Sequence, residues 1–223
     1  MTNLTEIGEH ELQLTLSDVV LTADLELPLN ATGLVIFAHG SGSSRRSPRN
    51  RMVAQYLGDL GLATLLFDLL TEPEQRRDET TRALRFDIAM LSRRLIGVID
   101  VMRDHPALTA MDVGLFGAST GAAAALIAAA ERASIIKAVV SRGGRTDLAA
   151  AAIERVEAAT LLLVGEHDQA VIEWNQQTAA RLHAPHRLEV IPGASHLFEE
   201  PGKLLSMAER AGDWFLKYLR RHD

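Results

Sequence analysis

The feature of this sequence that most constrains its fold is a regular alternation of short apolar runs with longer stretches of helical character. Six runs of four or five mainly apolar residues are each followed closely by Gly, Asp or Ser, at residues 34–38, 63–67, 113–116, 136–140, 160–164 and 188–191. Such runs are typical of parallel strands that are buried on both faces of a sheet. Because parallel strands need crossover connections, which are usually helices, the alternation predicts a doubly wound α/β sheet with helices on both faces.

The stretches between and after these runs predict six helices, at residues 49–60, 82–103, 120–133, 148–156, 173–183 and 202–220. Earlier in the chain, residues 12–16 and 23–27 alternate apolar and polar side chains, which indicates an antiparallel hairpin. Residues 73–77 are interpreted as a polar surface loop. We therefore expect an eight-stranded, mostly parallel sheet with the hairpin at its edge. The length of 223 residues and the lack of a visible linker favour a single domain, residues 1–223.

The composition argues against several classes of function. The chain has no cysteine, so it can form neither a disulfide nor a thiolate metal site. Its formal net charge of -6 argues against nucleic acid as the main partner, because phosphate binding needs clustered Lys and Arg. Residues 1–11 lack the pattern of a signal peptide, and the longest apolar run, residues 121–130, is about half of the roughly 20 residues that cross a bilayer. We expect a soluble, cytoplasmic protein with no membrane or nucleic-acid partner.

The most informative motif is Gly117-Ala-Ser-Thr-Gly121, which lies between a predicted strand and an alanine-rich predicted helix. In this context a G-x-S-x-G motif forces its serine into a strained turn that lifts the hydroxyl above the sheet. The start of the helix also favours developing negative charge. The alternative is a glycine-rich turn that only caps the helix or binds phosphate, but neither the G-x-G-x-x-G nor the P-loop spacing is present. The motif predicts that Ser119 is a nucleophile.

A serine nucleophile needs a base, and the base needs a carboxylate that fixes its tautomer. Of the eight histidines, only His196 lies in a loop directly after the last predicted strand, on the side of the sheet expected for Ser119. Asp168 ends the segment after the strand at residues 160–164 and is the preferred acid. Asp147 is its competitor, and Glu166 is disfavoured because strand alternation points it away from Asp168. The order serine, aspartate, histidine is the one used by α/β-hydrolases.

The same reading predicts an oxyanion hole made of two backbone amides. One is the amide of Thr120, the residue after the nucleophile, and the other comes from the loop His39-Gly-Ser-Gly-Ser-Ser44. We assign this second amide to Ser41, with Gly42 as the alternative, and interpret His39 as a residue that shapes the loop. The predicted chemistry requires no metal and no cofactor.

Taken together, these segments resemble the dienelactone hydrolase-like group of the α/β-hydrolase superfamily, over nearly the whole chain. The matching pieces are His39-Gly-Ser-Gly42, Gly117-Ala-Ser-Thr-Gly121, Gly165-Glu-His-Asp168 and Gly193-Ala-Ser-His196. The resemblance implies the α/β-hydrolase fold. The enzyme that gives the group its name uses a cysteine nucleophile, whereas this chain has Ser119 at that place.

The predicted function is that of a serine hydrolase that cleaves a small ester, whether a carboxylester, a lactone or a thioester, through an acyl-serine intermediate. Only about fifteen residues separate Gly144 from Ala159, enough for one short helix and too few for a cap domain, so the site is expected to be open. Two alternatives stay open. One is a protein that binds a ligand or partner on this fold without turnover, and the other is an acyltransferase or perhydrolase that uses the same serine.

Arginines cluster beside the expected mouth of the site, at Arg45, Arg46, Arg49, Arg51, Arg142 and Arg145. Because the planar guanidinium suits carboxylate or phosphate, they suggest an anionic small-molecule substrate, with Arg49 and Arg142 as its contacts. The alternative is that these arginines are solvated or form salt bridges.

Overall fold

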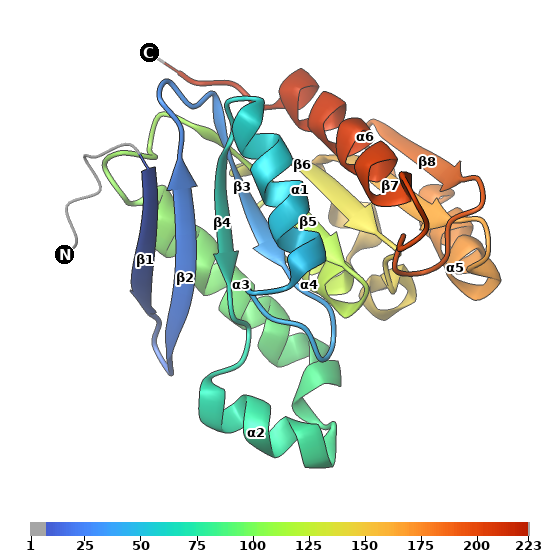
Figure 1. Cartoon of the computed structure of the whole chain (residues 1–223), viewed down its shortest axis with the longest axis horizontal. Helices are drawn as coiled ribbons and strands as arrows, with labels where there is room; N and C mark the ends of the chain where they lie inside the picture. The colour runs from blue at the N-terminus through green and yellow to red at the C-terminus, as the bar shows by residue number, and fades with distance from the viewer. Residues whose placement is uncertain (1–7, 223) are drawn as a thin grey trace.

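The computed structural model describes residues 8–222, and a twisted sheet of eight strands lies at its centre (Figure 1). The order across the sheet is β1-β2-β4-β3-β5-β6-β7-β8. The strands are β1 (Gly8–Thr15), β2 (Val20–Leu27), β3 (Gly33–Ala38), β4 (Ala63–Phe67), β5 (Asp112–Ala118), β6 (Ile136–Arg142), β7 (Ala159–Gly165) and β8 (His186–Ile191). The β1–β2 and β2–β4 pairs are antiparallel, and the other neighbouring pairs are parallel. The predicted α/β-hydrolase fold with an N-terminal edge hairpin is confirmed.

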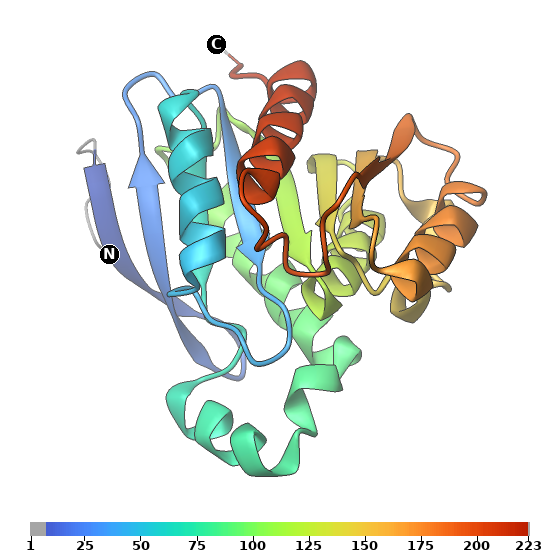
Figure 2. The same ribbon diagram turned by 45° about the vertical axis from the view of Figure 1, so that its right-hand side comes forward.

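Helices cover both faces of this sheet. They are α1 (Pro48–Asp59), α2 (Glu72–Thr81), α3 (Ile88–Arg103), α4 (Thr120–Glu131), α5 (Gln169–Ala179) and α6 (Lys203–Tyr218). In Figures 1 and 2, α1 and α6 lie in front of the sheet, and α3 and α4 lie behind it. Within residues 8–222, no helix combines the length and the apolar character that crossing a bilayer requires.

Two apolar cores explain why the central strands appear as continuous apolar runs in the sequence. Neighbouring residues of a strand point to opposite faces. Val139 and Leu162 accordingly pack into the core beneath α3 and α4, whereas Val140 and Leu161 pack into the core beneath α1 and α6. The parallel strands then present all their carboxyl ends at one edge of the sheet, and α2 lies beyond that edge (Figures 1 and 2).

The polar-loop interpretation of residues 73–77 is wrong, because these residues lie in α2. Thr71 and Glu74 form a capping box: the Thr71 hydroxyl accepts from the Glu74 amide, and the Glu74 carboxylate accepts from the Thr71 amide at 2.8 Å. Pro73 occupies the first turn, where its missing N–H costs nothing. The helix forms although almost none of its surface is apolar, because the capping box satisfies its N-terminus and the Arg82 amide donates to the Asp78 carbonyl at its C-terminus.

The prediction of an α-helix over residues 148–156 is also wrong. Two short 3₁₀ turns, Thr146–Ala149 and Ile153–Arg155, occupy this stretch. Such turns repeat every three residues and bury Ala149, Ala152 and Ile153 in the short crossover. No cap domain is inserted at this point of the described chain, as predicted.

Two other helix boundaries differ from the prediction. The stretch over residues 82–103 is broken, because Arg82 ends α2 in a left-handed conformation (φ 55°) and α3 begins only at Ile88. The Asp87 carboxylate caps α3 by accepting from the Met90 amide at 2.9 Å. The helix predicted at residues 173–183 starts earlier, as α5 begins directly after Asp168.

Candidate active site

Ser119 lies on a sharp turn between the end of β5 and the start of α4. Its backbone has φ 50° and ψ -119°, a conformation that residues other than glycine rarely adopt. The flanking glycines are required sterically: a Cβ on Gly117 would lie 2.5 Å from Ala122 Cα, and one on Gly121 would lie 2.1 Å from Ala38 O. The close approach of β5, α4 and β3 is what lifts Ser119 above the sheet edge.

The loop after β3 passes beside Ser119. A Cβ on Gly40 would lie 3.1 Å from Ser119 Cβ, so the two segments are in contact. Within residues 8–222, the amides of Ser41 and Thr120 donate to no protein acceptor. Both predicted oxyanion-hole amides, and that of Gly42, are therefore available to a ligand.

His39 holds this loop. Its buried ring donates from Nδ1 to the Gly40 carbonyl at 2.9 Å, and its Nε2 accepts from the Leu69 amide at 3.0 Å. Burial lowers the pKa of His39, and its hydrogen bond to Gly40 opposes this effect only in part. His39 is thus a neutral residue with both ring nitrogens engaged, which agrees with the loop-shaping role expected for it.

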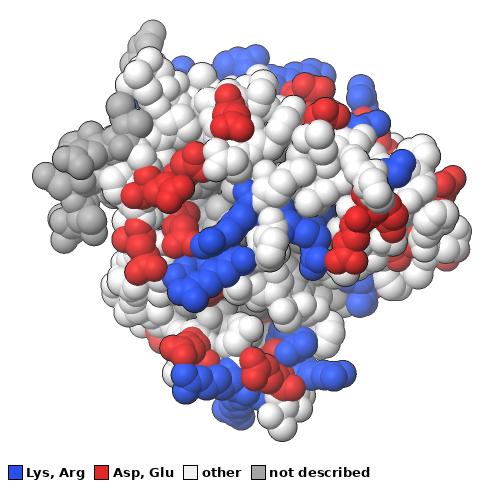
Figure 3. Space-filling view, viewed as in Figure 1, with Lys and Arg blue, Asp and Glu red and all other residues white. Residues whose placement is uncertain are grey.

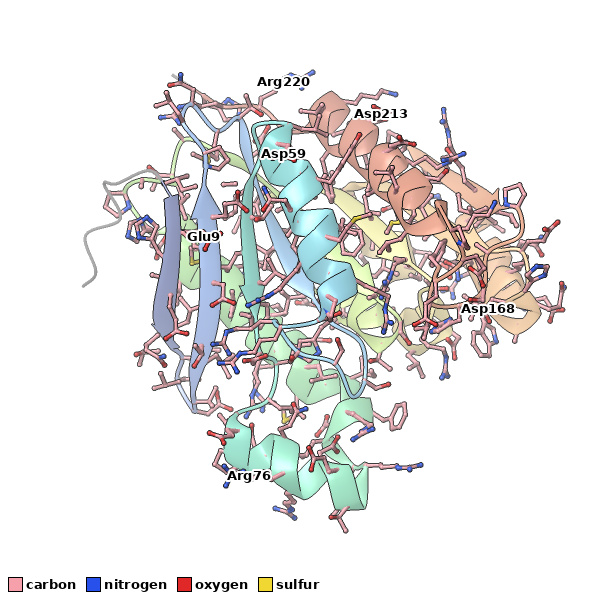
Figure 4. All side chains as sticks on the ribbon, viewed as in Figure 1. Glu9, Asp59, Arg76, Asp168, Asp213 and Arg220 are labelled. Atoms are coloured by element: carbon pink, nitrogen blue, oxygen red, sulfur yellow. The ribbon has the colours of Figure 1, made fainter. Side chains whose placement is uncertain are left out.

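The structure brings His196 and Asp168 together. Asp168 follows β7 at the start of α5, where Figure 4 labels it, and His196 follows β8. Nδ1 of His196 and Oδ2 of Asp168 are 2.5 Å apart. Gly143, with φ 53°, also lies against the ring, because a Cβ there would be 3.3 Å from both Cε1 and Nδ1 of His196. Within residues 8–222, the Nε2 atom makes no hydrogen bond, so it is the nitrogen free to accept a proton.

The two competing carboxylates are engaged elsewhere. Asp147 accepts two hydrogen bonds from Arg145, at 2.9 and 2.8 Å, and the Arg145 guanidinium stacks 4.5 Å from the ring centroid of Trp174. Glu166 accepts from the Gly193 amide at 2.7 Å. Of the three acids considered, Asp168 alone hydrogen-bonds to His196.

Two acidic residues that the sequence interpretation missed hold the His196 loop. Both carboxylate oxygens of Glu200 accept from the Ser195 amide at 3.1 Å, and hydrogen bonding from the Ser195 side chain and then from its amide lowers the pKa of Glu200. Glu199 pairs with Arg49 at 2.6 Å and so ties the loop to the start of α1. The sequence signal for this role was their place three and four residues after His196.

The arginine cluster divides into paired and unpaired members. Arg45 is buried and forms ion pairs with Glu11, Asp24 and Asp68, and Arg51 pairs with Asp24. Figure 3 shows basic side chains near the start of α1 with acidic ones around them. For Arg45, Arg49, Arg51 and Arg145, the salt-bridge alternative therefore holds, whereas the Arg46 side chain is exposed.

Arg142 differs from all of these. It is the last residue of β6, it is 7% exposed, and its Nε and Nη1 atoms are buried with no hydrogen-bond partner within residues 8–222. Burial, and then the positive charge of Arg49, lower the pKa of Arg142 to about 10. The Nε atom of Arg49 is likewise buried without a partner.

The fold defines this protein as a member of the α/β-hydrolase class, with Ser119 at the turn between β5 and α4. The chain belongs to the dienelactone hydrolase family, whose model matches residues 21–219. A dienelactone hydrolase from Anabaena variabilis, known from a crystal structure, is 52% identical in sequence to this chain. The match covers 96% of this chain and 99% of that one, with a TM-score of 0.94. Est1E from Butyrivibrio proteoclasticus is 18% identical, covers 94% of this chain and 98% of that one, and has a TM-score of 0.77, which shows the shared fold.

Among curated proteins, a Mycobacterium tuberculosis relative named "Putative phosphoribosyl transferase" is 50% identical over 213 residues. The match covers 96% of this chain and 47% of the relative. The chain therefore spans about half the length of the curated relatives that it matches.

Proposed function

We propose that this protein is a metal-free serine hydrolase that cleaves small esters through an acyl-serine intermediate. The observation that carries the proposal is the 2.5 Å contact between His196 and Asp168, at the sheet edge where Ser119 occupies its strained turn. The free amides of Ser41 and Thr120 add the donors that an oxyanion requires.

In the proposed reaction, His196 Nε2 takes the proton of the Ser119 hydroxyl while the Ser119 Oγ atom attacks the carbonyl carbon of the ester. The amides of Ser41 and Thr120 donate to the oxyanion of the tetrahedral intermediate. The intermediate collapses when His196 returns the proton to the departing alcohol, which leaves an acyl-serine. Water then attacks the acyl-serine by the same steps and releases the carboxylic acid. Asp168 keeps the proton on Nδ1 and stabilises the imidazolium throughout.

The substrate is proposed to be a small carboxylester, lactone or thioester, because the short β6–β7 crossover leaves the site without a cap. An acyltransferase or perhydrolase would form the same acyl-serine and differ only in the acceptor that releases it. The mycobacterial relative's name describes phosphoribosyl transfer. We propose that this chain corresponds to a hydrolase-fold half of such a protein and that its own reaction is hydrolysis. The cytoplasm is its proposed location.

Kinetics of p-nitrophenyl acetate hydrolysis test the proposal and the choice of acid. We expect His196→Ala to lower kcat by several orders of magnitude and Asp168→Asn to lower it by roughly 10⁴-fold, as replacement of the triad aspartate does in trypsin. Asp147→Asn is the matched control and should stay within about threefold of wild type, because Asp147 pairs with Arg145. A larger loss in Asp147→Asn would show that the acid is wrongly assigned. Wild-type turnover no faster than that of Ser119→Ala would favour a non-catalytic binding protein.

A further inference from the structure

Asn175 is a fully buried amide side chain in the middle of α5. It is 0% exposed, and its Nδ2 group donates to the Val171 carbonyl at 2.8 Å and to the Gly144 carbonyl at 2.9 Å. Asparagine is a poor helix former, and burial of its amide is unfavourable unless the amide is hydrogen-bonded. The bond to Val171 is local, because that residue lies one turn earlier in the same helix. The bond to Gly144 instead joins α5 to the chain that follows β6.

The segment that Asn175 holds is residues 142–145, which begins with the last residue of β6. Gly144 is buried, and within residues 8–222 its carbonyl accepts from no group other than Asn175. The segment is also tightly packed, because a Cβ on Gly144 would lie 2.0 Å from Ser141 Oγ and 2.8 Å from Ala122 Cβ. A buried carbonyl that loses its only donor is destabilised, so loss of the Asn175 amide should displace the segment.

The 142–145 segment contacts the Ser119 turn on both of its sides. The Ser119 amide donates to the Arg142 carbonyl at 3.1 Å, and the Arg145 amide donates to the Ser119 carbonyl at 3.0 Å. These two bonds bracket the residue whose φ of 50° is strained. A strained conformation persists only where its surroundings fix it, so the Ser119 turn depends on the position of the segment.

The same segment contacts the ring of His196. A Cβ on Gly143 would lie 3.3 Å from Nδ1 and Cε1 of His196, and Gly143 is the residue before the one that Asn175 holds. The helix that carries Asn175 also begins directly after Asp168, which Figure 4 labels. One helix therefore carries the acid at its start and, through Asn175, fixes the backbone that borders Ser119 and His196.

We propose that Asn175 is a positioning residue of the active site, which sets the geometry between Ser119 and His196 through the 142–145 segment. The inference rests on the serine-hydrolase function proposed above and adds to it a fully buried residue that does not touch the substrate. Misplacement of reacting groups by about 1 Å can lower a rate by roughly a hundredfold. Loss of the Asn175 amide should therefore lower kcat and leave KM almost unchanged.

Two substitutions keep one hydrogen bond of Asn175 and remove the other. In Asn175→Thr the hydroxyl can still donate to the Val171 carbonyl one turn earlier, but it ends one bond short of the position from which Nδ2 reaches Gly144. Asn175→Ser does the same with a smaller side chain, and it serves where the branched threonine prevents folding. Thr178→Val is the matched control, because Thr178 lies in the same helix, is 4% exposed and makes no side-chain hydrogen bond to residues 142–145.

The first test measures p-nitrophenyl acetate hydrolysis at a temperature at which each variant is folded, with kcat expressed per active site. The number of active sites is taken from the fluorophosphonate adduct at Ser119 at the end of labelling. We expect Asn175→Thr and Asn175→Ser to lower kcat between about tenfold and a hundredfold, with KM within about threefold of wild type. Thr178→Val should keep kcat within about twofold of wild type.

A purely structural role would lower the Tm or the number of active sites and leave kcat per active site unchanged. A kcat per active site within about twofold of wild type in both Asn175 variants would therefore overturn the proposal. An equal loss of kcat in Thr178→Val would overturn it as well, because any buried change in α5 would then have the same effect.

The second test uses NMR and does not depend on turnover. In wild type, a scalar coupling across the hydrogen bond should join the Asn175 Nδ2 group to the Gly144 carbonyl carbon, and its absence would refute the proposal without any variant. In Asn175→Thr, the amides of Ser119 and Arg145 should exchange their hydrogens at least about tenfold faster than in wild type. The Asp68 amide, which is hydrogen-bonded to β2, is the reference that corrects for global unfolding.

Unchanged exchange at Ser119 and Arg145 would show that Asn175 does not hold the segment and would refute the proposal. The two tests also separate this inference from the function on which it rests. If wild type hydrolyses the ester and both Asn175 variants keep its kcat, only the positioning role fails. If exchange changes as predicted but wild type neither hydrolyses the ester nor reacts with fluorophosphonate, the serine-hydrolase function fails and the hold of Asn175 on the Ser119 turn stands.

Discussion

The ion pair between Glu74 and Arg94 fixes α2 beside the candidate active site, and its loss has a predictable cost. Arg94 is 4% exposed, and its guanidinium donates to both Glu74 oxygens at 2.7 Å and to the Leu69 carbonyl at 2.8 Å. Glu74→Gln removes the charge and one acceptor and leaves the buried guanidinium poorly matched. The helix concerned borders the pocket that Ser41 and Thr120 also line.

The structure gives the size of the effect. Hydrogen bonds from Arg94, opposed by burial, lower the pKa of Glu74 from 4.5 to about 2. At about 1.4 kcal/mol for each pH unit, this difference corresponds to roughly 3 kcal/mol. Because 29% of the Glu74 side chain is exposed, solvent screening reduces the expected loss to about 2 kcal/mol of unfolding free energy.

Urea unfolding at pH 7 measures this loss, and Glu72→Gln is the matched control. Glu72 lies in the same helix and pairs with Arg76, but both side chains are about three-quarters exposed, so its replacement should cost less than about 0.5 kcal/mol. A similar small loss in both variants would refute the reasoning.

The pH dependence gives an independent check of the same pair. A carboxyl with a depressed pKa stabilises the fold above its unfolded pKa and loses this effect as pH falls through the folded value. The difference in stability between wild type and Glu74→Gln should therefore be complete above about pH 4.5 and shrink toward pH 2. A difference that does not change over this range would contradict the assigned cause.

Two further predictions concern the site. EDTA should leave the kcat/KM for p-nitrophenyl acetate unchanged, and a loss of activity that a divalent metal restores would contradict the metal-free mechanism. Gly117→Ala should lower both kcat/KM and unfolding free energy, because its Cβ would lie 2.5 Å from Ala122 Cα. Gly61→Ala meets no atom within 4 Å but strains a backbone with φ 83°, so it should lower the unfolding free energy and leave kcat/KM at the wild-type level.

The strands and the Ser119 turn could be predicted from the sequence because each depends on a local pattern, whereas the order of the strands across the sheet came only from the structure. Continuous apolar runs identify parallel strands, and G-x-S-x-G between a strand and a helix identifies the turn. The α2 helix was missed because apolar periodicity does not form it. Its signal was the capping pair Thr71 and Glu74, a T-x-x-E pattern.

The pairing of the arginines could not be predicted from the sequence. Arg45 finds its partners on β1, on β2 and after β4, at residues distant in the chain, so only the folded sheet brings them together. The same holds for Arg142, whose Nε and Nη1 atoms find no hydrogen-bond partner among residues 8–222 of the packed structure.

The most direct test of the central claim asks whether Ser119 is chemically activated. Wild-type protein is treated with a fluorophosphonate, and the modified residue is located by peptide mass spectrometry. We predict a single adduct per chain, at Ser119, with none in Ser119→Ala and slower labelling in His196→Ala. Labelling that persists in Ser119→Ala, or that falls on another serine of the wild-type chain, would contradict the assignment.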